Sequence, residues 1–271
     1  MNIKIFDVAH GFCSLITADN GNLILLDCGS DGYNFTPTNY LRKIQCTGIE
    51  SLIISNFDED HITDLPNILA NYRIDVLYRN QSITPSQLEN LKLVNGPITP
   101  AMRSALNLSI NYSNPISVYP DYAGIEMNIY QNNYPTFTDT NNLSILTFIE
   151  YNNFSIVYTG DLESSGWDKL LDNTYVQERL KKVSIFVASH HGRKSGFNAN
   201  VFEYCKPSII IISDKEVVYE TQRHNYSQYA KGISWNNGSE TRYVLSTRND
   251  GHMNIDIKSD SSFYISTNYG I

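Results

Sequence analysis

Carboxylate and imidazole side chains are concentrated in one short stretch of the chain, residues 55–61, which reads Ser-Asn-Phe-Asp-Glu-Asp-His. The stretch directly follows a strongly β-forming run at residues 51–54. Residues after a strand end lie at one edge of a sheet, where ligands spaced by one residue can converge on a single point. Oxygen and nitrogen donors gathered in this way suit a hard or borderline divalent cation. Taken alone, however, such a stretch is more often an acidic, solvated loop.

Two later segments repeat the pattern of a β-rich run that ends in ligand-type residues. Residues 154–162 place Gly160, which permits a tight turn, directly before Asp161, and residues 183–192 end with His190 and His191 near the strand exit. A single Gly-Asp pair is usually a turn, and a single His pair is often a surface or core pair. Three such strand ends in one chain are stronger evidence, because a shared sheet edge would bring their side chains together. The sequence therefore predicts a metal site.

The elements that must position these residues follow from the hydrophobic pattern. We expect a hairpin over residues 2–27, a strand at 51–55, and a helix over 62–72 directly behind the metal motif. Between residues 97 and 139 the chain is rich in Asn, Tyr, Pro and Ser, which predicts strands and loops that form a lid or one wall of a cleft. The other expected elements are helices at 39–45, 85–94 and 166–171, strands at 76–78, 144–149, 155–158, 183–189 and 208–212, and short strands from 217 onward.

The composition allows one large α/β domain or two smaller lobes, and we predict a single domain over residues 1–271. Of the 271 residues, 41% are hydrophobic and 18% are charged, which is enough to bury a full core. The sequence has no apolar run long enough to span a membrane and no signal-peptide pattern, so we expect a cytoplasmic protein without a membrane partner. The four cysteines lack a Cys-x-x-Cys spacing and are expected to be reduced thiols.

The net charge of −8 argues against a large nonspecific nucleic-acid footprint, which normally needs a clustered basic surface. The objection is partial, because bound cations would offset part of the negative charge of the predicted site. The charge therefore favours a small or single-stranded substrate over a long duplex.

Five segments of the chain match a known set of motifs in order and approximate spacing. They are Asp7-Val8-Ala9-His10-Gly11, Asp27-Cys28-Gly29, Asn56-x-Asp58-x-Asp60-His61, Asn141-Asn142-Leu143-Ser144-Ile145 and His190-His191-Gly192-Arg193. In this combination the chain resembles the metallo-β-lactamase superfamily, and within it the branch of the hydrolase domain of the DNA-uptake competence protein ComEC. The resemblance covers the chain from residue 3 to about residue 215, and a later element of the branch is loosely echoed around His224.

The resemblance implies a four-layer αββα sandwich and a metal-dependent hydrolase. The superfamily residue that matches Asp161 bridges two cations, so Asp161 would do the same here. Asp60 and His61 would hold one of the two cations. Asp58, together with His190 or His191, would complete the pair. The residues that the resemblance assigns to catalysis, with a water between the cations as nucleophile, are Asp60, Asp161 and His224.

Three positions bear on the chemistry of this predicted centre. Asn56 is a metal-site position where the branch has a histidine, and it offers a weak amide oxygen. A carboxylate at Asp58 hardens the site, which favours manganese or magnesium over zinc, with up to two cations bound. Arg193 replaces a serine of the branch and could pair with a substrate phosphate or with a neighbouring acid.

A hard centre of two cations fits phosphodiester hydrolysis, because the cations can stabilise the nonbridging oxygens, the attacking hydroxide and the departing alkoxide together. We therefore expect a phosphodiesterase or nuclease that acts on nucleic acid or a small nucleotide. Asn56 supports an alternative, a degenerate member of the fold that serves as a binding or regulatory module without turnover. Hydrolysis of a carboxylic ester or lactone is a third possibility.

Overall fold

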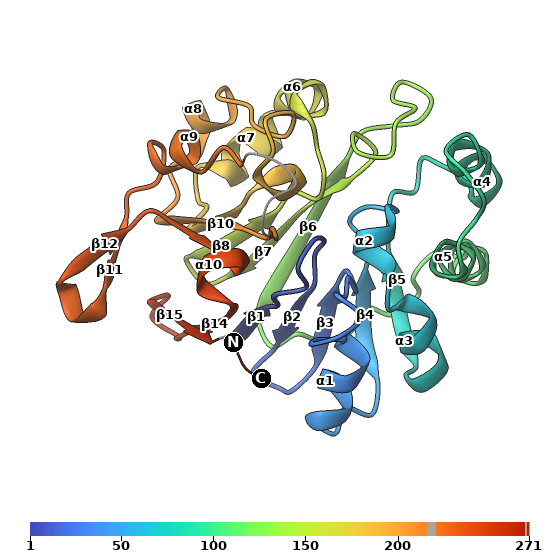
Figure 1. Cartoon of the computed structure of the whole chain (residues 1–271), viewed down its shortest axis with the longest axis horizontal. Coiled ribbons are helices and arrows are strands. Elements are labelled where there is room, and N and C mark those ends of the chain that lie inside the picture. Colours follow the sequence, from blue (N-terminus) through green and yellow to red (C-terminus); the bar gives the residue numbers. More distant parts are fainter. Residues whose placement is uncertain (216–220, 269, 271) are drawn as a thin grey trace.

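Two β-sheets pack face to face, and each is covered by helices on its outer side (Figure 1). The structure, a computed structural model, describes residues 1–215, 221–268 and 270. The first sheet contains strands from both ends of the chain, whereas the second is built from the middle and later part. This arrangement is an α/β sandwich of four layers, αββα, which confirms the predicted fold class.

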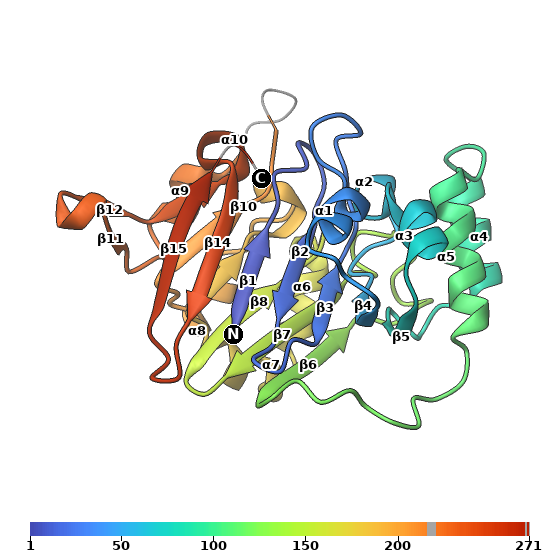
Figure 2. The same ribbon diagram turned by 90° about the horizontal axis from the view of Figure 1, so that it is seen from below.

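The first sheet has seven strands in the order β15-β14-β1-β2-β3-β4-β5 (Figure 2). Strands β3, β4 and β5 run parallel to one another, and the remaining neighbours are antiparallel. The strands are β1 (Asn2–Ile5), β2 (Ser14–Thr17), β3 (Leu23–Leu26), β4 (Ile49–Ile53), β5 (Ile74–Tyr78), β14 (His252–Ile257) and β15 (Phe263–Asn268).

The second sheet has six strands in the order β13-β10-β9-β8-β7-β6. Strands β8, β9, β10 and β13 are parallel, while β6 and β7 form an antiparallel edge. The strands are β6 (Ile125–Gln131), β7 (Ile145–Tyr151), β8 (Phe154–Tyr158), β9 (Ile185–Val187), β10 (Ile209–Ile212) and β13 (Val244–Ser246). A separate two-stranded sheet pairs β11 (Ile233–Trp235) with β12 (Glu240–Arg242).

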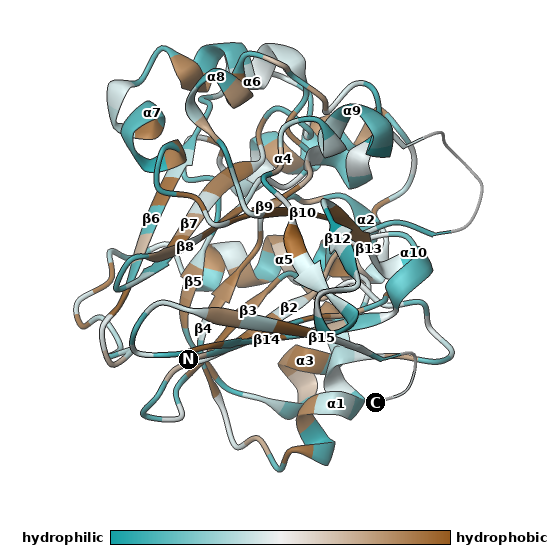
Figure 3. Cartoon of the chain, turned by 90° about the vertical axis from the view of Figure 1, so that its left-hand side faces the viewer, coloured by the Kyte–Doolittle hydropathy of each residue, from teal (hydrophilic) through white to brown (hydrophobic). Residues whose placement is uncertain are grey.

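Alternation of side chains along the strands explains the layers. In β10, Ile209 and Ile211 belong to the cluster of apolar side chains between the sheets, whereas Ile210 and Ile212 face the outer helices. Strand β3 follows the same rule, with Ile24 packed between the sheets and Leu25 packed under the helices. Because both faces of these strands are buried, their sequences are continuously apolar, and Figure 3 shows the central strands in brown.

Helices of the first half cover the first sheet, and helices of the second half cover the second sheet (Figure 1). The first group comprises α1 (Pro37–Lys43), α2 (Glu59–Ile62), α3 (Leu65–Asn71), α4 (Pro85–Leu93) and α5 (Pro100–Asn111). The second comprises α6 (Ser164–Leu171), α7 (Thr174–Leu180), α8 (Val201–Tyr204) and α9 (Arg223–Ser227). The short helix α10 (Thr247–Asp250) links β13 to β14, and 3-10 turns lie at Ser189–Gly192 and Asn236–Gly238.

Three helices begin with the same Thr-Pro pair. Thr36, Thr84 and Thr99 each accept a hydrogen bond from a backbone N–H of the first turn. The proline that follows each threonine is suited to the first helical position, because its missing N–H would have no partner there. This local signal sets where α1, α4 and α5 begin.

Several predicted elements differ from the structure. The expected hairpin over residues 2–27 is three antiparallel strands, β1, β2 and β3. The helix expected over 62–72 starts later, as α3 at Leu65, because Asp64 before it takes a non-helical ψ. Ile62 is instead the last residue of the separate short helix α2. The segment 97–139 was expected to lack helices but contains α5, and α7 was not predicted. Residues 216–220, part of the expected C-terminal strands, lie outside the described residues.

No helix in the described part of the chain is long and apolar enough to cross a membrane.

Candidate metal centre

Four side chains from three strand ends of the sandwich meet at one point. Asp60 and His61 lie in α2 just after β4, Asp161 follows β8, and His191 lies in the turn after β9. Their ligand atoms all lie within 4.8 Å of one another. The convergence arises because β4 of one sheet and the parallel pair β8 and β9 of the other end at the same edge of the sandwich. Parallel strands deliver the residues that follow them to one edge.

The separations between these ligand atoms match those expected around one cation. The Nε2 atom of His61 lies 3.1 Å from Asp161 Oδ1. The Nε2 atom of His191 lies 3.1 Å from Asp60 Oδ2 and 3.5 Å from Asp161 Oδ1. Ligands bound at about 2.0–2.2 Å in tetrahedral or octahedral geometry are about 3.0–3.5 Å apart. A single divalent cation could therefore contact all four residues.

Both imidazoles of the cluster are oriented by hydrogen bonds from their other ring nitrogen. His61 Nδ1 donates to Asp27 Oδ2 at 2.7 Å, and His191 Nδ1 donates to the carbonyl oxygen of Ser213 at 3.0 Å. This leaves Nε2 as the atom directed into the cluster, as in histidines that bind metals. The buried Nε2 of His191 makes no hydrogen bond with any described residue. A buried nitrogen that faces two carboxylates in this way is placed as a metal ligand.

Asp27 is a fully buried residue that supports the cluster and was not among the predicted site residues. Its carboxylate accepts hydrogen bonds from the backbone N–H of Ser55 at 2.7 Å and from the Ser55 hydroxyl at 2.5 Å, in addition to the bond from His61. The residue has a φ of +57°, in the left-handed region that Asp tolerates better than most residues. A sequence signal was present, since Asp27 ends the apolar run of β3.

Without a metal, the cluster holds protons on its histidines. Burial opposes the charged form of His61, but Asp161 and Asp27 outweigh it and raise its pKa well above the usual 6.5. His191 behaves in the same way. Burial lowers its pKa, but Asp161 and Asp60 outweigh burial, so the pKa is raised overall. Burial also opposes ionisation of Asp60 and Asp161, yet the neighbouring histidines lower both pKa values. A metal would take the place of these protons.

Glycines allow the loops around the cluster to approach closely. A Cβ atom at Gly11 would lie 2.1 Å from the carbonyl oxygen of Asp60, and one at Gly29 would lie 2.3 Å from the same atom. Gly160 has a φ of +52°, and a Cβ there would lie 2.9 Å from the side chain of Ser144. The glycines of the three sequence motifs therefore fix the backbone that carries Asp60 and Asp161.

The structure brings His191 into the cluster and directs His190 elsewhere. Both residues have left-handed backbone angles, with φ values of +49° and +54°, which is strained for residues with side chains. His190 Nδ1 lies 3.0 Å from the Ser195 hydroxyl, and its Nε2 accepts a hydrogen bond from Arg193 at 3.0 Å. Thus one residue of the predicted pair faces the metal position and the other anchors the following turn.

Two predicted ligands in the first half of the motif lie outside the four-residue cluster. Asn56 Oδ1 accepts the backbone N–H of Asp58 at 2.7 Å, and its Nδ2 donates to the Ser144 hydroxyl at 3.1 Å. The carboxylate of Asp58 pairs with the Lys92 ammonium group through Oδ1, which also accepts the Thr140 hydroxyl at 2.8 Å. Both side chains therefore have partners within the protein.

The residues predicted to act in catalysis are divided in the same way. Asp60 and Asp161 lie in the cluster, whereas His224 lies in α9 with an exposed side chain. Its carbonyl oxygen accepts the hydroxyl of Ser227, a contact within the helix.

A cationic wall next to the cluster was not predicted as a whole. His10 Nε2 lies 3.3 Å from Asp60 Oδ2 and accepts a hydrogen bond from Arg193 at 2.8 Å. Burial, together with His191, lowers the pKa of His10 to about 4, so it is neutral at physiological pH. A narrow cavity beside the cluster is lined by His10, His191, Arg193, Asp214, Lys215, Thr221 and Arg248. Arg193, Lys215 and Arg248 are cationic, and Asp214 is acidic and pairs with Arg248 at 2.6 Å.

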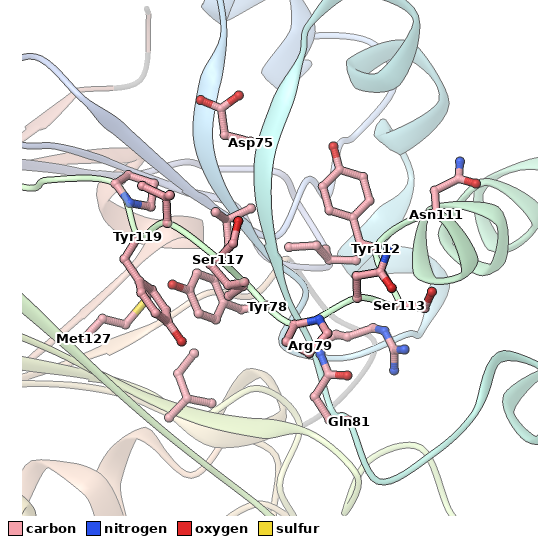
Figure 4. Close-up of a pocket in the computed structure, with 18 of the residues that line it drawn as sticks. Asp75, Tyr78, Arg79, Gln81, Asn111, Tyr112, Ser113, Ser117, Tyr119 and Met127 are labelled. Atoms are coloured by element: carbon pink, nitrogen blue, oxygen red, sulfur yellow. The ribbon is translucent and has the colours of Figure 1, made fainter.

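A large cavity lies away from the cluster (Figure 4). It has a volume of about 910 Å³ and lies between the edge strands β5 and β6 of the two sheets, where residues 111–120 form one wall. Figure 4 shows Tyr78, Tyr119 and Met127 around it. The segment predicted to line the catalytic cleft therefore lines a different cavity, and the described lining includes none of the four cluster residues.

No protein-family model matches the sequence, and no curated protein matches it. Solved structures that resemble the chain include a candidate zinc-dependent hydrolase of the metallo-β-lactamase superfamily from Thermotoga maritima, with 12% identity, a TM-score of 0.44, and coverage of 90% of this chain and 97% of that one. Igni18, a metallo hydrolase from Ignicoccus hospitalis, has 10% identity and a TM-score of 0.48 over 95% of this chain and 100% of its own. A diphosphatase of the PhnP family has 10% identity and a TM-score of 0.46 over 95% and 98% of the two chains. At 10–12% identity, these likenesses concern the fold alone.

Proposed function

We propose that the chain is a metal-dependent hydrolase of phosphodiesters, with a nucleic acid or a small nucleotide as its substrate. The observation that carries the proposal is the cluster of Asp60, His61, Asp161 and His191, whose ligand atoms converge and whose histidines are oriented from behind. When bound there, a divalent cation would activate water as a nucleophile near neutral pH and stabilise charge on a phosphoryl oxygen.

The protein residues around the cluster contribute orientation and charge. Asp27 and the Ser213 carbonyl hold the two imidazoles in the tautomer that exposes Nε2. The cavity beside the cluster presents Arg193, Lys215 and Arg248, against one carboxylate. Guanidinium groups bind phosphate oxygens through paired hydrogen bonds, so this wall favours an anionic substrate over a neutral ester or lactone. The motif resemblance to the ComEC branch supports the same substrate class.

The ligands that meet in the cluster support a choice of metal. The expectation of manganese or magnesium rested on a carboxylate at position 58, but Asp58 lies outside the cluster and pairs with Lys92. Two imidazoles and two carboxylates form a mixed set that suits zinc and manganese better than magnesium, which prefers oxygen ligands. We therefore propose zinc or manganese.

One observation favours a second candidate, a binding or regulatory module without turnover. Asn56 stands at a predicted ligand position, yet its amide serves the backbone of Asp58 and the side chain of Ser144. The two functions differ in one outcome, since only the hydrolase turns substrate over.

The test is an activity panel with zinc, manganese and magnesium. Substrates are bis-p-nitrophenyl phosphate, single-stranded DNA, RNA, plasmid and cyclic dinucleotides, with p-nitrophenyl acetate as the neutral ester. We expect phosphodiester cleavage, and we expect its rate to fall at least about 100-fold in Asp161→Ala and His61→Ala. Removing a metal ligand should cost more activity than removing a residue that only hydrogen-bonds to a ligand, which typically costs about 10–100-fold. Asp260→Asn, an exposed carboxylate in the turn between β14 and β15, is the control and should retain activity. Metal binding without cleavage of any substrate would favour the binding module.

A further inference from the structure

Asn56 and Asp58, the first half of the predicted metal motif, form hydrogen bonds and an ion pair with other residues of the protein. Asn56 is 1% exposed and uses both ends of its amide, because Oδ1 accepts the Asp58 N–H while Nδ2 donates to Ser144 Oγ and, at 3.4 Å, to the Thr140 carbonyl oxygen. The Ser144 hydroxyl also accepts the backbone N–H of Asp161 at 3.0 Å. The amide of Asn56 therefore acts as a brace between the motif and the loop that carries Asp161.

Asp58 forms an ion pair with the ammonium group of Lys92. Its Oδ1 atom accepts hydrogen bonds from the Lys92 ammonium group and from the Thr140 hydroxyl. Lys92 comes from α4, and its side chain is only 16% exposed, so this pair is partly shielded from water. A second divalent cation at Asp58 would lie beside an ammonium group and would be repelled by it. Among the described residues, no group of His, Cys, Asp and Glu side chains that is compact enough to hold a metal includes Asp58.

The remaining donors form a single coordination sphere. Among the described residues, one group of His, Cys, Asp and Glu side chains is compact enough to hold a metal, and it contains neither Asp58 nor His190. All four of its ligand atoms lie within 4.8 Å of one another, close enough for one ion to contact them. His190 is held away by Arg193 and Ser195.

We infer that the chain binds a single divalent cation, held by Asp60, His61, Asp161 and His191, and that Lys92 neutralises Asp58 where a second cation would otherwise do so. This inference rests on the proposed function, because it assumes that the cluster binds a metal. It changes the chemistry, since one cation and a fixed ammonium group replace a pair of cations.

The experiment measures how many metal ions bind, independently of activity. Metal-free protein is titrated with manganese or zinc by isothermal calorimetry, and native mass spectrometry counts the ions retained. We expect one ion per chain. Two ions would overturn the inference while leaving the proposed function in place. The absence of any bound ion would remove both. At two equivalents of manganese, the paramagnetic resonance spectrum should be that of an isolated ion, and an exchange-coupled spectrum would also overturn the inference.

A charge-neutral double variant, Asp58→Asn with Lys92→Met, removes the protein's own ion pair without changing net charge. We expect it to bind one cation with a Kd within about threefold of the wild type, because neither side chain is a ligand. His191→Ala is the matched variant inside the cluster, and its Kd should rise at least about 100-fold. If the double variant instead lost its cation or weakened binding as much as His191→Ala, Asp58 would be a ligand and the inference would be wrong. Circular dichroism confirms that each variant is folded before titration.

Discussion

Replacement of Asp27 by asparagine tests whether the buried carboxylate controls the cluster. The substitution keeps the shape of the side chain but removes the charge that binds His61 Nδ1 at 2.7 Å. Loss of such an outer partner typically weakens metal binding by about 10–100-fold, or about 1.4–2.7 kcal/mol. We expect Asp27→Asn to raise the Kd for zinc or manganese by this factor in a chelator-competition assay.

The pH dependence of metal binding gives a second measure in the same variant. Burial opposes the charged His61, but Asp161 and Asp27 raise its pKa, so a proton competes with the metal at any pH below that raised value. Metal affinity should therefore fall as pH is lowered and level off above the pKa. Removal of the Asp27 charge lowers the pKa of His61, so the levelling point should move to lower pH.

A buried carboxylate outside the cluster provides the control. Asp64 is 3% exposed and accepts hydrogen bonds from the Thr38 N–H and the Asn67 amide, both at 2.8 Å. Asp64→Asn should cost about 1–3 kcal/mol of stability through these bonds and leave the Kd for the metal unchanged. If Asp27→Asn bound metal within twofold of the wild type, with an unshifted pH profile, the assignment of Asp27 as the residue that orients His61 would be refuted.

Further outcomes follow from the backbone, the core and the charges of the site. Gly160→Ala should lower the free energy of unfolding by about 2–4 kcal/mol, from backbone strain and overpacking. Gly21→Ala shares the left-handed φ but has no atom within 4 Å, so urea denaturation should show a smaller loss of about 1–2 kcal/mol. Trp167→Phe removes a buried indole that donates to a serine hydroxyl at 2.8 Å and should cost about 1–3 kcal/mol in the same assay. In the metal-free protein, the raised pKa of His61 contributes stability that is complete below pH 6.5 and is lost as pH rises through the folded-state pKa. The lowered pKa of Asp161 contributes stability that is present above pH 3.8 and is lost as pH falls. Calorimetry of the protein with chelator should therefore show the highest Tm between pH 3.8 and pH 6.5. A Tm that kept rising into alkaline pH would contradict this account.

The apolar strands could be predicted because their sequences leave little choice. The run at β10 is four isoleucines, and each of them is buried in the structure. The helix α5 was missed because Asn, Tyr, Pro and Ser dominate the segment around it. Its own signals were local: Thr99 and Pro100 at its start, and buried alanines, leucines and a methionine on one face.

The sequence predicted those site residues that directly follow strands, but not the contacts that the packing of other segments creates. Asp60, His61 and Asp161 follow β-rich runs, and the structure brings them together. Sequence could not separate His190 from His191, because backbone angles in the turn decide which ring faces the cluster. It also could not show that Lys92, which is distant in the sequence, pairs with Asp58. Such a partner becomes visible only when α4 is packed beside the motif.

The pairing of β1 with β14 has a consequence for biosynthesis. Residues 2–5 pair with residues 253–256, so one side of β1 has no neighbour until residues 253–256 have been synthesised and have left the ribosome. During that interval the nascent chain carries an open strand edge, which other chains could join. Contacts this distant in sequence also slow folding, because the loop between them must close first. Yield in a cell should therefore depend on how well that unfinished edge is shielded during translation.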